Sequence, residues 1–76
     1  MTPPTTLAQR TVLEIRAEIG RQNRSAASLA REVGMSKMYL WRRMNGQFPF
    51  DLTEVENIAS ALGVSTSQLI PLTVAG

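Results

Sequence analysis

The chain has 76 residues and a mass of 8.3 kDa, and it contains neither cysteine nor histidine. This length allows one small domain, which buries only about 60 % of the surface of its unfolded chain. The missing residue types exclude disulfides, thiol redox chemistry, zinc sites with His or Cys ligands, and a histidine general base. We therefore expect neither a metal nor a cofactor, and a fold held together by packing alone.

Basic and acidic residues are separated along the chain, although the net charge is only +2. Residues 1–50 contain all eight Lys and Arg residues and three acids, whereas residues 51–76 contain three acids and no base. Six of the bases lie within residues 21–47, where Glu32 is the only acid. A concentration of positive charge in the middle of so small a protein indicates a polyanionic partner.

The sequence contains no membrane or export signal. Residues 1–6, Met-Thr-Pro-Pro-Thr-Thr, have neither a basic nor an apolar region of the kind found in signal peptides. No apolar run approaches the roughly 18 residues that a membrane-spanning helix requires. We expect a cytoplasmic protein without a membrane partner.

The apolar residues repeat with helical periodicity, which predicts an all-α bundle of five short helices. Thr6 and Gln9 form a capping box that starts a helix over 7–21. Gly20 and the polar run 21–24 are expected to end it. Its inward stripe is predicted to be Ala8, Val12, Ile15 and Ile19.

Two more helices are predicted in the middle of the chain. Ser25 caps the first of them, which Gly34 stops, because glycine adopts the left-handed conformation easily. Ser36 caps the next, over about 37–45.

The last two helices follow a loop at 47–50. Asp51 and Glu54 form a second capping box, and Gly63 is the stop for that helix. Its inward residues are predicted to be Leu52, Val55, Ile58 or Ala59, and Leu62. Ser65 and Gln68 start a short fifth helix through Ile70, before Pro71. The domain organisation is a flexible arm (1–6), a helix-turn-helix domain (7–71) and a tail (72–76).

Residues 26–45 have the pattern of a helix-turn-helix. Gly34 makes the tight turn, Met35 fills the corner between the helices, and Ala30 is small enough for the second helix to cross close to it. The inward residues are Leu29, Ala30, Val33, Leu40 and Met44. Two helices joined by so short a turn are typical of DNA-binding domains whose second helix enters the major groove.

This pattern resembles the Cro and phage-repressor helix-turn-helix family, in particular the short regulators of actinobacterial phages. The resemblance covers about residues 25–70. Its motifs are Leu29-Ala30, Gly34-Met35-Ser36, Arg42-Arg43-Met44-Asn45-Gly46, Pro49-Phe50, Ile58-Ala59, Ala61-Leu62-Gly63-Val64 and Leu69. One departure is Arg43, where many members have an aliphatic residue, so that Met44 takes the packing role here.

The resemblance implies a lambda-repressor-like domain in which the third helix contacts double-stranded DNA. It places base reading at Lys37, Met38, Trp41 and Arg42, and phosphate contacts at Ser36 and Tyr39. We also expect phosphate contacts from Arg43 and from Ser25, which stands at a helix N-terminus.

Structural roles are open alternatives for several of these side chains. Arg42 could be a solvated charge, and Tyr39 could cover the helix surface. Trp41 could fold onto Phe48 and Phe50 as a satellite core, and Ser25 could serve as a helix cap.

The sequence therefore predicts a sequence-specific transcription regulator, a phage or prophage repressor or Cro-like protein that acts by occupying its operator. The alternative is a helix-turn-helix used as a protein-interaction module, antitoxin-like or binding a host factor. The basic segment favours DNA. We expect no enzyme, because no nucleophile, base and orienting group are grouped in the sequence.

Dimer formation on DNA is also expected, because one recognition helix reads too few base pairs for useful specificity. The contact is predicted within residues 64–74. Its apolar residues are Val64, Leu69, Ile70, Leu72 and Val74. The alternative is that Leu69 and Ile70 complete the monomer core.

Overall fold

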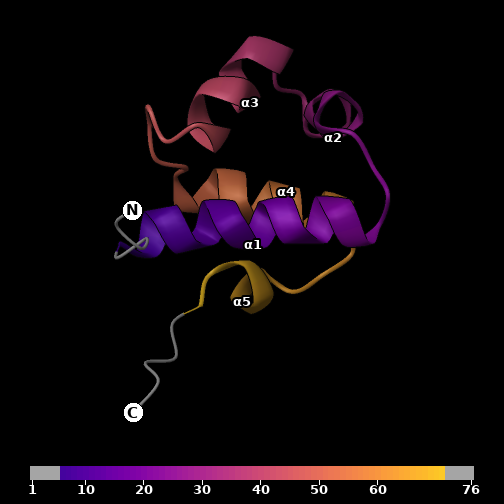
Figure 1. The fold of residues 1–76 in the computed structure, drawn as a ribbon. Helices are drawn as coiled ribbons and strands as arrows, with labels where there is room; N and C mark the ends of the chain where they lie inside the picture. The colour runs from indigo at the N-terminus through magenta and orange to yellow at the C-terminus, as the bar shows by residue number, and fades with distance from the viewer. Residues whose placement is uncertain (1–5, 72–76) are drawn as a thin grey trace.

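A computed structural model of the chain describes residues 6–71, and within that range it consists of five α-helices without strands (Figure 1). The helices are α1 (Leu7–Arg21), α2 (Ala26–Val33), α3 (Lys37–Met44), α4 (Leu52–Leu62) and α5 (Thr66–Leu69). In Figure 1, α2 and α3 lie above α1 and α4, and α5 lies below them. The predicted all-α fold is confirmed. Residues 1–5 of the predicted arm and the tail 72–76 lie outside the described residues.

Capping side chains start the helices where the sequence predicts. Thr6 Oγ1 accepts a hydrogen bond from the Gln9 amide at 3.0 Å, and Gln9 Oε1 accepts one from the Thr6 amide at 3.1 Å. Asp51 and Glu54 make the equivalent reciprocal pair, at 2.7 and 3.0 Å. Each box satisfies amide groups that have no partner within the helix, which explains the sharp starts of α1 and α4.

The helix ends differ from the prediction in details. Gly34 has a φ of +75° and ends α2 as expected. Gly20 instead lies inside α1, and the left-handed residue after that helix is Asn23, with a φ of +57°. Asparagine tolerates this conformation better than most residues. α3 and α5 each end one residue earlier than predicted, at Met44 and Leu69.

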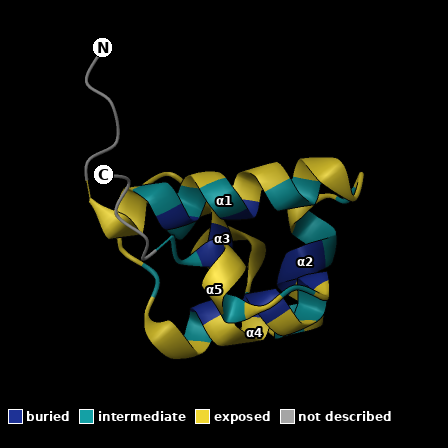
Figure 2. Cartoon of the chain, turned by 90° about the horizontal axis from the view of Figure 1, so that it is seen from below, coloured by how far each residue is buried: buried dark blue, intermediate teal, exposed yellow. Residues whose placement is uncertain are grey.

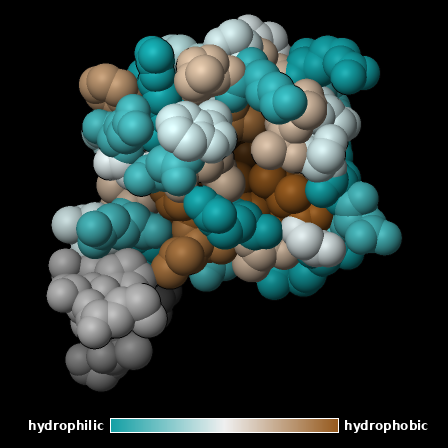
Figure 3. All heavy atoms as spheres, turned by 45° about the horizontal axis from the view of Figure 1, so that its top comes forward, coloured by the Kyte–Doolittle hydropathy of each residue, from teal (hydrophilic) through white to brown (hydrophobic). Residues whose placement is uncertain are grey.

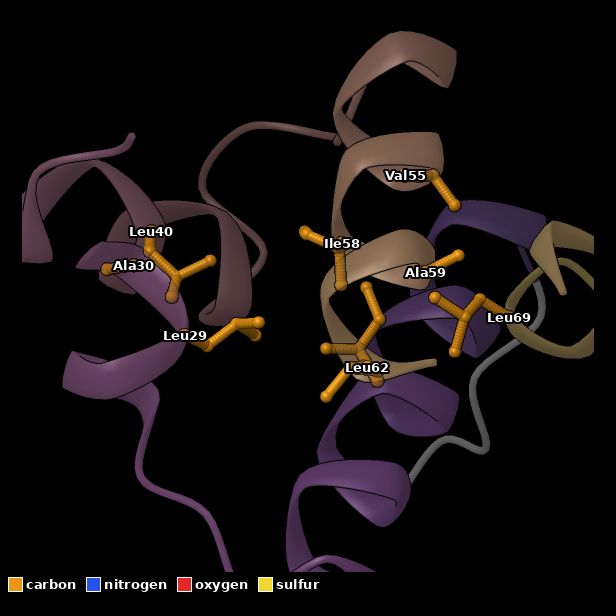
Figure 4. Packing of buried hydrophobic residues seen from close by; sticks show 9 residues of the cluster. Leu29, Ala30, Leu40, Val55, Ile58, Ala59, Leu62 and Leu69 are labelled. Carbon is orange, nitrogen blue, oxygen red and sulfur yellow. The ribbon is translucent and has the colours of Figure 1, made fainter. Parts of the chain in front are cut away.

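The core lies where α2 packs against α3 and α4, and it continues from α4 to α5 (Figure 4). In Figure 4, Leu29 and Leu40 point toward Ile58 and Leu62, and Leu69 lies beside Leu62. Figure 2 shows the buried residues on the inner faces of the helices and the exposed residues on their outer faces. The buried hydrophobic residues are Ile15, Leu29, Ala30, Leu40, Val55, Ile58, Ala59, Leu62 and Leu69.

Ala8, Val12, Thr11 and Leu52 depart from the predicted core; Val12 is half-buried and is not among the hydrophobic residues packed against the core. Ala8 is exposed, and Thr11 is 4 % exposed on the same helix, so the buried stripe of α1 is rotated from the predicted one. Leu52 is 72 % exposed because it stands at the first position of α4, before that helix reaches the core. Leu69 is 1 % exposed, which confirms the alternative that it completes the monomer core.

Long-range hydrogen bonds fasten the segment between α1 and α2 to the end of α4. Arg24 Nη1 donates to the Ala61 carbonyl at 2.8 Å, and Gln22 Nε2 donates to the Leu62 carbonyl at 2.6 Å. The last carbonyls of a helix lack partners within it and carry its partial negative charge. Arg24, which lies in the segment after α1, therefore caps the C-terminal end of α4.

The longest described helix, α1, has 15 residues. No helix within residues 6–71 is long and apolar enough to cross a membrane.

Candidate nucleic-acid interface

The helix-turn-helix places α3 on the outside of the molecule, with one side of α3 packed against the rest of the domain. α2 packs against α3 and α4, and Leu40 is 1 % exposed between them. Met35 in the turn and Met44 at the end of α3 pack against the core, as predicted. Arg16 Nη2 donates to the Met44 carbonyl at 2.9 Å, so α1 also holds the C-terminal end of α3. The sequence does not predict this bond, because no local pattern connects residues 28 positions apart.

The solvent-exposed surface of α3 carries the four predicted base-reading residues. Met38 is 55 % exposed and Trp41 is 53 % exposed. Lys37 and Arg42 are exposed beside them, and neither has an ion pair within residues 6–71. Figure 3 brings forward the side that carries α2 and α3, where mostly hydrophilic side chains surround a hydrophobic hollow.

Trp41 lies on the side of α3 that borders α1 and α2. It lines a groove of about 280 Å³ with Arg16 and Ile19 of α1, Ala26 of α2, and Lys37, Met44 and Asn45. Phe50 packs against the main core instead, and Phe48 is 50 % exposed. The satellite core of Trp41 on Phe48 and Phe50 is therefore not formed.

Tyr39 and Arg43 are engaged within the protein. The guanidinium carbon of Arg43 lies 3.6 Å from the Tyr39 ring centroid, and Arg43 Nε donates to Glu54 Oε1 at 3.2 Å. The Tyr39 hydroxyl donates to the other Glu54 oxygen. Glu54 also accepts the Asp51 amide, so its carboxylate joins α3 to the start of α4. We call Tyr39, Arg43 and Glu54 the α3–α4 cluster.

The α3–α4 cluster shifts the pKa values of two of its members. Burial alone would raise the pKa of Glu54, but hydrogen bonds from Tyr39, the Asp51 amide and Arg43 together hold that pKa below its usual value. The hydrogen bond to the Glu54 carboxylate raises the pKa of Tyr39. Glu54 is thus ionised and Tyr39 neutral at physiological pH. In these states the Tyr39 hydroxyl can donate a hydrogen bond and the Glu54 carboxylate can accept it.

The sequence predicts Glu54 only as a capping residue. Its link to Tyr39 and Arg43 depends on how α4 crosses α3, and no spacing in the chain encodes this crossing. The one feature of the sequence that pointed to this link is Arg43, a charged residue at a position where many members of the family that it resembles have an aliphatic residue.

Ion pairs divide the basic residues of the segment 21–47 into two groups. Arg21 pairs with Glu18 at 2.7 Å, Arg24 pairs with Glu32, and Arg43 pairs with Glu54. Within segment 21–47, the exposed bases that form no ion pair with the described residues are Arg31, Lys37 and Arg42. The positive charge available to a partner is therefore concentrated on α3 and the preceding helix.

Ser25 and Ser36 are helix caps in this structure. The Ser25 hydroxyl oxygen accepts the Ser28 amide at 3.1 Å, and that of Ser36 accepts the Tyr39 amide at 3.0 Å. Each hydroxyl keeps its own hydrogen, so it can donate to a phosphate oxygen while it caps. The capping roles predicted for both serines are confirmed.

Comparison with known proteins supplies a family and a similar structure. Residues 6–75 match the family described as the BetR domain. The chain is similar to a crystal structure of the hypothetical transcription factor NHTF from Neisseria, with a TM-score of 0.75 and 25 % sequence identity. That similarity covers 91 % of this chain and 86 % of the Neisseria chain. No curated protein matches the sequence.

Proposed function

The chain belongs to the BetR domain family, and from this premise we propose that it is a sequence-specific DNA-binding transcription regulator. The similarity to a protein described as a hypothetical transcription factor supports this proposal. The observation that carries it is the exposed side of α3. There Lys37 and Arg42, without ion pairs in the described chain, flank the exposed apolar residues Met38 and Trp41.

We assign base reading to Lys37, Met38, Trp41 and Arg42, with α3 in the major groove. An arginine donates two hydrogen bonds to guanine O6 and N7, and apolar side chains contact thymine methyl groups. The hydroxyls of Ser25 and Ser36 stand at the N-termini of α2 and α3, where amide groups and the helix dipole favour a phosphate. Because Glu54 neutralises Arg43, we assign Tyr39 and Arg43 chiefly to holding α3 in place.

The regulatory role that we propose is repression of the Cro or phage-repressor kind. A cytoplasmic protein of this size that occupies an operator excludes polymerase from the promoter without any catalytic step. The protein would need no metal or cofactor for that mechanism.

Selection of bound sequences from a random DNA pool tests the proposal. We expect a defined operator whose affinity falls steeply with salt. If Arg31, Lys37 and Arg42 each contact one phosphate, log K against log salt has a slope of about −2.7 per protomer, at roughly −0.9 per phosphate. A pool without enrichment, or a flat salt dependence, would favour the alternative of a protein-interaction module.

We also propose that two copies pair on the operator through residues 64–74. Leu69 is buried, and Val64 and Ile70 pack against the core. The other apolar residues of the segment, Leu72 and Val74, lie outside the described residues. Sedimentation of the full chain and of a chain ending at Pro71, each with operator DNA, tests this contact. Unchanged stoichiometry and affinity after truncation would exclude it.

A further inference from the structure

A small apolar groove lies where the first half of α1 meets the start of α4 and the end of α5. Its volume is about 170 Å³. The buried residues Thr11 and Val55 form its floor, and Leu52, which is 72 % exposed, stands at its rim. Figure 1 shows α5 on the side of α1 and α4 opposite to α2 and α3. The full set of lining residues is Leu7, Ala8, Thr11, Phe50, Leu52, Val55 and Ile70.

The exposed rim of this groove is not needed for the fold. Leu52 stands at the first position of α4 and is not part of the core, and Leu7 is 38 % exposed at the first position of α1. Exposing grouped apolar side chains to water is unfavourable, which indicates a contact with a partner. The groove is smaller than the roughly 300–1,000 Å³ of pockets for small molecules, but it has room for one or two apolar side chains.

Arg10 provides a second, independent observation beside the groove. It is three residues from Leu7 on α1, which makes the two side chains neighbours on the helix surface. Its Nε is buried and has no hydrogen-bond partner in the part of the chain that the structure describes. A buried donor without an acceptor is costly. The groove therefore suits a partner that brings both apolar side chains and carbonyl oxygens, as a peptide segment does.

The chain itself carries a segment of this kind next to the groove. Ile70 lines the groove with an extended backbone, at a φ of −110° and a ψ of 94°, and Leu72 and Val74 follow Pro71 in the sequence. Two residues at this spacing lie on the same side of an extended segment. The groove and the segment are thus neighbours on each copy. One two-fold axis can therefore bring each segment to the groove of the other copy.

We propose that the groove is the site that receives Leu72 and Val74 of a second copy. This inference rests on the proposed function, because it supplies the receiving site for the pairing on operator DNA. α3 contributes no residue to the groove, so both copies keep this helix available for DNA.

Crosslinking between two single variants tests the site, because the chain has no cysteine of its own. Ala8→Cys marks the rim, and Thr73→Cys marks the segment while Leu72 and Val74 stay in place. The two variants are mixed on the selected operator and treated with a short bismaleimide, and intact mass identifies the products. We expect the mixed pair as the main product. Ala17→Cys is the matched control, because Ala17 is exposed on the same helix outside the groove, and it should give little of this product.

A charge at the rim should prevent pairing without unfolding the domain. We expect Leu52→Glu to weaken binding of the second protomer to the operator by at least about tenfold, the value of one buried leucine side chain. Its affinity for a duplex with a single half-site should not change. Leu13→Glu is the control, because Leu13 is 48 % exposed on α1 outside the groove, and it should pair normally. Sedimentation measures the stoichiometry, and thermal unfolding checks the fold of each variant.

Arg10→Met separates pairing from stability. Methionine keeps an apolar stem and removes the buried donor that has no partner within residues 6–71. The melting temperature of the single chain should therefore not fall, whereas pairing on the operator should weaken. A lower melting temperature with unchanged pairing would remove Arg10 from the site.

The outcomes separate this inference from the function on which it rests. Equal crosslinking of Ala8→Cys and Ala17→Cys would overturn the site. A double variant, Ala8→Cys with Thr73→Cys, that links only within one chain would show that the segment covers its own groove, which also overturns the proposal. A random pool without an enriched sequence would remove DNA binding itself. Crosslinking without DNA at millimolar protein concentration then still decides: the mixed pair supports the site, and its absence overturns it.

Discussion

The guanidinium carbon of Arg43 lies 3.6 Å from the centroid of the Tyr39 ring, and both side chains also bind the carboxylate of Glu54. Tyr39 and Arg43 are on α3, and Glu54 is on α4. This carboxylate therefore joins the helix proposed to read DNA to α4. The side chains of Glu54 and Arg43 are only 12 % and 19 % exposed, so solvent screens their ion pair less than a surface pair.

Replacing Glu54 by glutamine should destabilise the protein. Glu54→Gln keeps the shape of the side chain and removes the charge that Arg43 and Tyr39 bind. We expect the free energy of unfolding at pH 7 to fall by about 1.5–3 kcal/mol, the value of a hydrogen bond to a charged group. Urea unfolding measures it. Glu56→Gln is the control, because Glu56 is exposed on the same helix, and an equal loss there would contradict the role of the cluster.

The contribution of Glu54 should depend on pH in a defined direction. The pKa of Glu54 is lower in the folded protein than in the unfolded chain, where the pKa of a glutamate is about 4.3. Ionised Glu54 therefore stabilises the fold above that pH, and this stabilisation is lost as the pH falls through the folded-state pKa. The difference in unfolding free energy between the unmodified protein and Glu54→Gln should shrink below about pH 4.3. A difference that is constant from pH 7 to pH 3 would exclude this titration.

Arg42 and Arg31 should affect DNA binding in different ways. Arg42→Ala should lose about 1–3 kcal/mol of binding free energy on the selected operator and much less on a scrambled duplex. Arg31→Ala should weaken binding to both duplexes alike and reduce the salt slope by about 0.9. Anisotropy titrations at several salt concentrations measure both effects. Equal losses on the two duplexes for Arg42→Ala would remove Arg42 from the base-reading residues.

Arg24 should matter for stability more than for DNA binding. Its guanidinium donates to the Ala61 carbonyl and pairs with Glu32, and its side chain is 20 % exposed. Arg24→Ala should lower the free energy of unfolding by about 1 kcal/mol. The salt slope of DNA binding should remain that of the unmodified protein, in contrast to Arg31→Ala. A reduced slope would show that Arg24 reaches phosphate.

Leu40→Ala should unfold the protein rather than change its specificity. Leu40 is 1 % exposed on the buried side of α3, and truncating a buried leucine costs about 2–5 kcal/mol. In a domain this small, such a loss removes much of the total stability. Met38→Ala, on the exposed side of the same helix, should change the unfolding free energy by less than about 0.5 kcal/mol. Similar losses for the two variants, measured by circular dichroism in urea, would contradict this division of α3 into a buried and an exposed side.

The sequence by itself determined the helices and the helix-turn-helix. Capping pairs such as Thr6 with Gln9, and the left-handed Gly34, act over a few residues. The spacing of these residues in the sequence is therefore enough to predict them. The exposure of Met38, Trp41 and Arg42 followed from the same local geometry, because α3 has one side toward Leu40. These features required no knowledge of how the helices pack.

The tertiary structure alone decided which charges are free. In the sequence the bases of segment 21–47 are equivalent, but Arg24 is bound to Glu32 and to α4, and Arg43 is bound to Glu54. The rotation of the stripe on α1 toward Thr11 and the exposure of Leu52 were decided in the same way. The reason is that an ion pair or a buried face depends on which helix crosses which, and this crossing is set by packing between residues far apart in the chain.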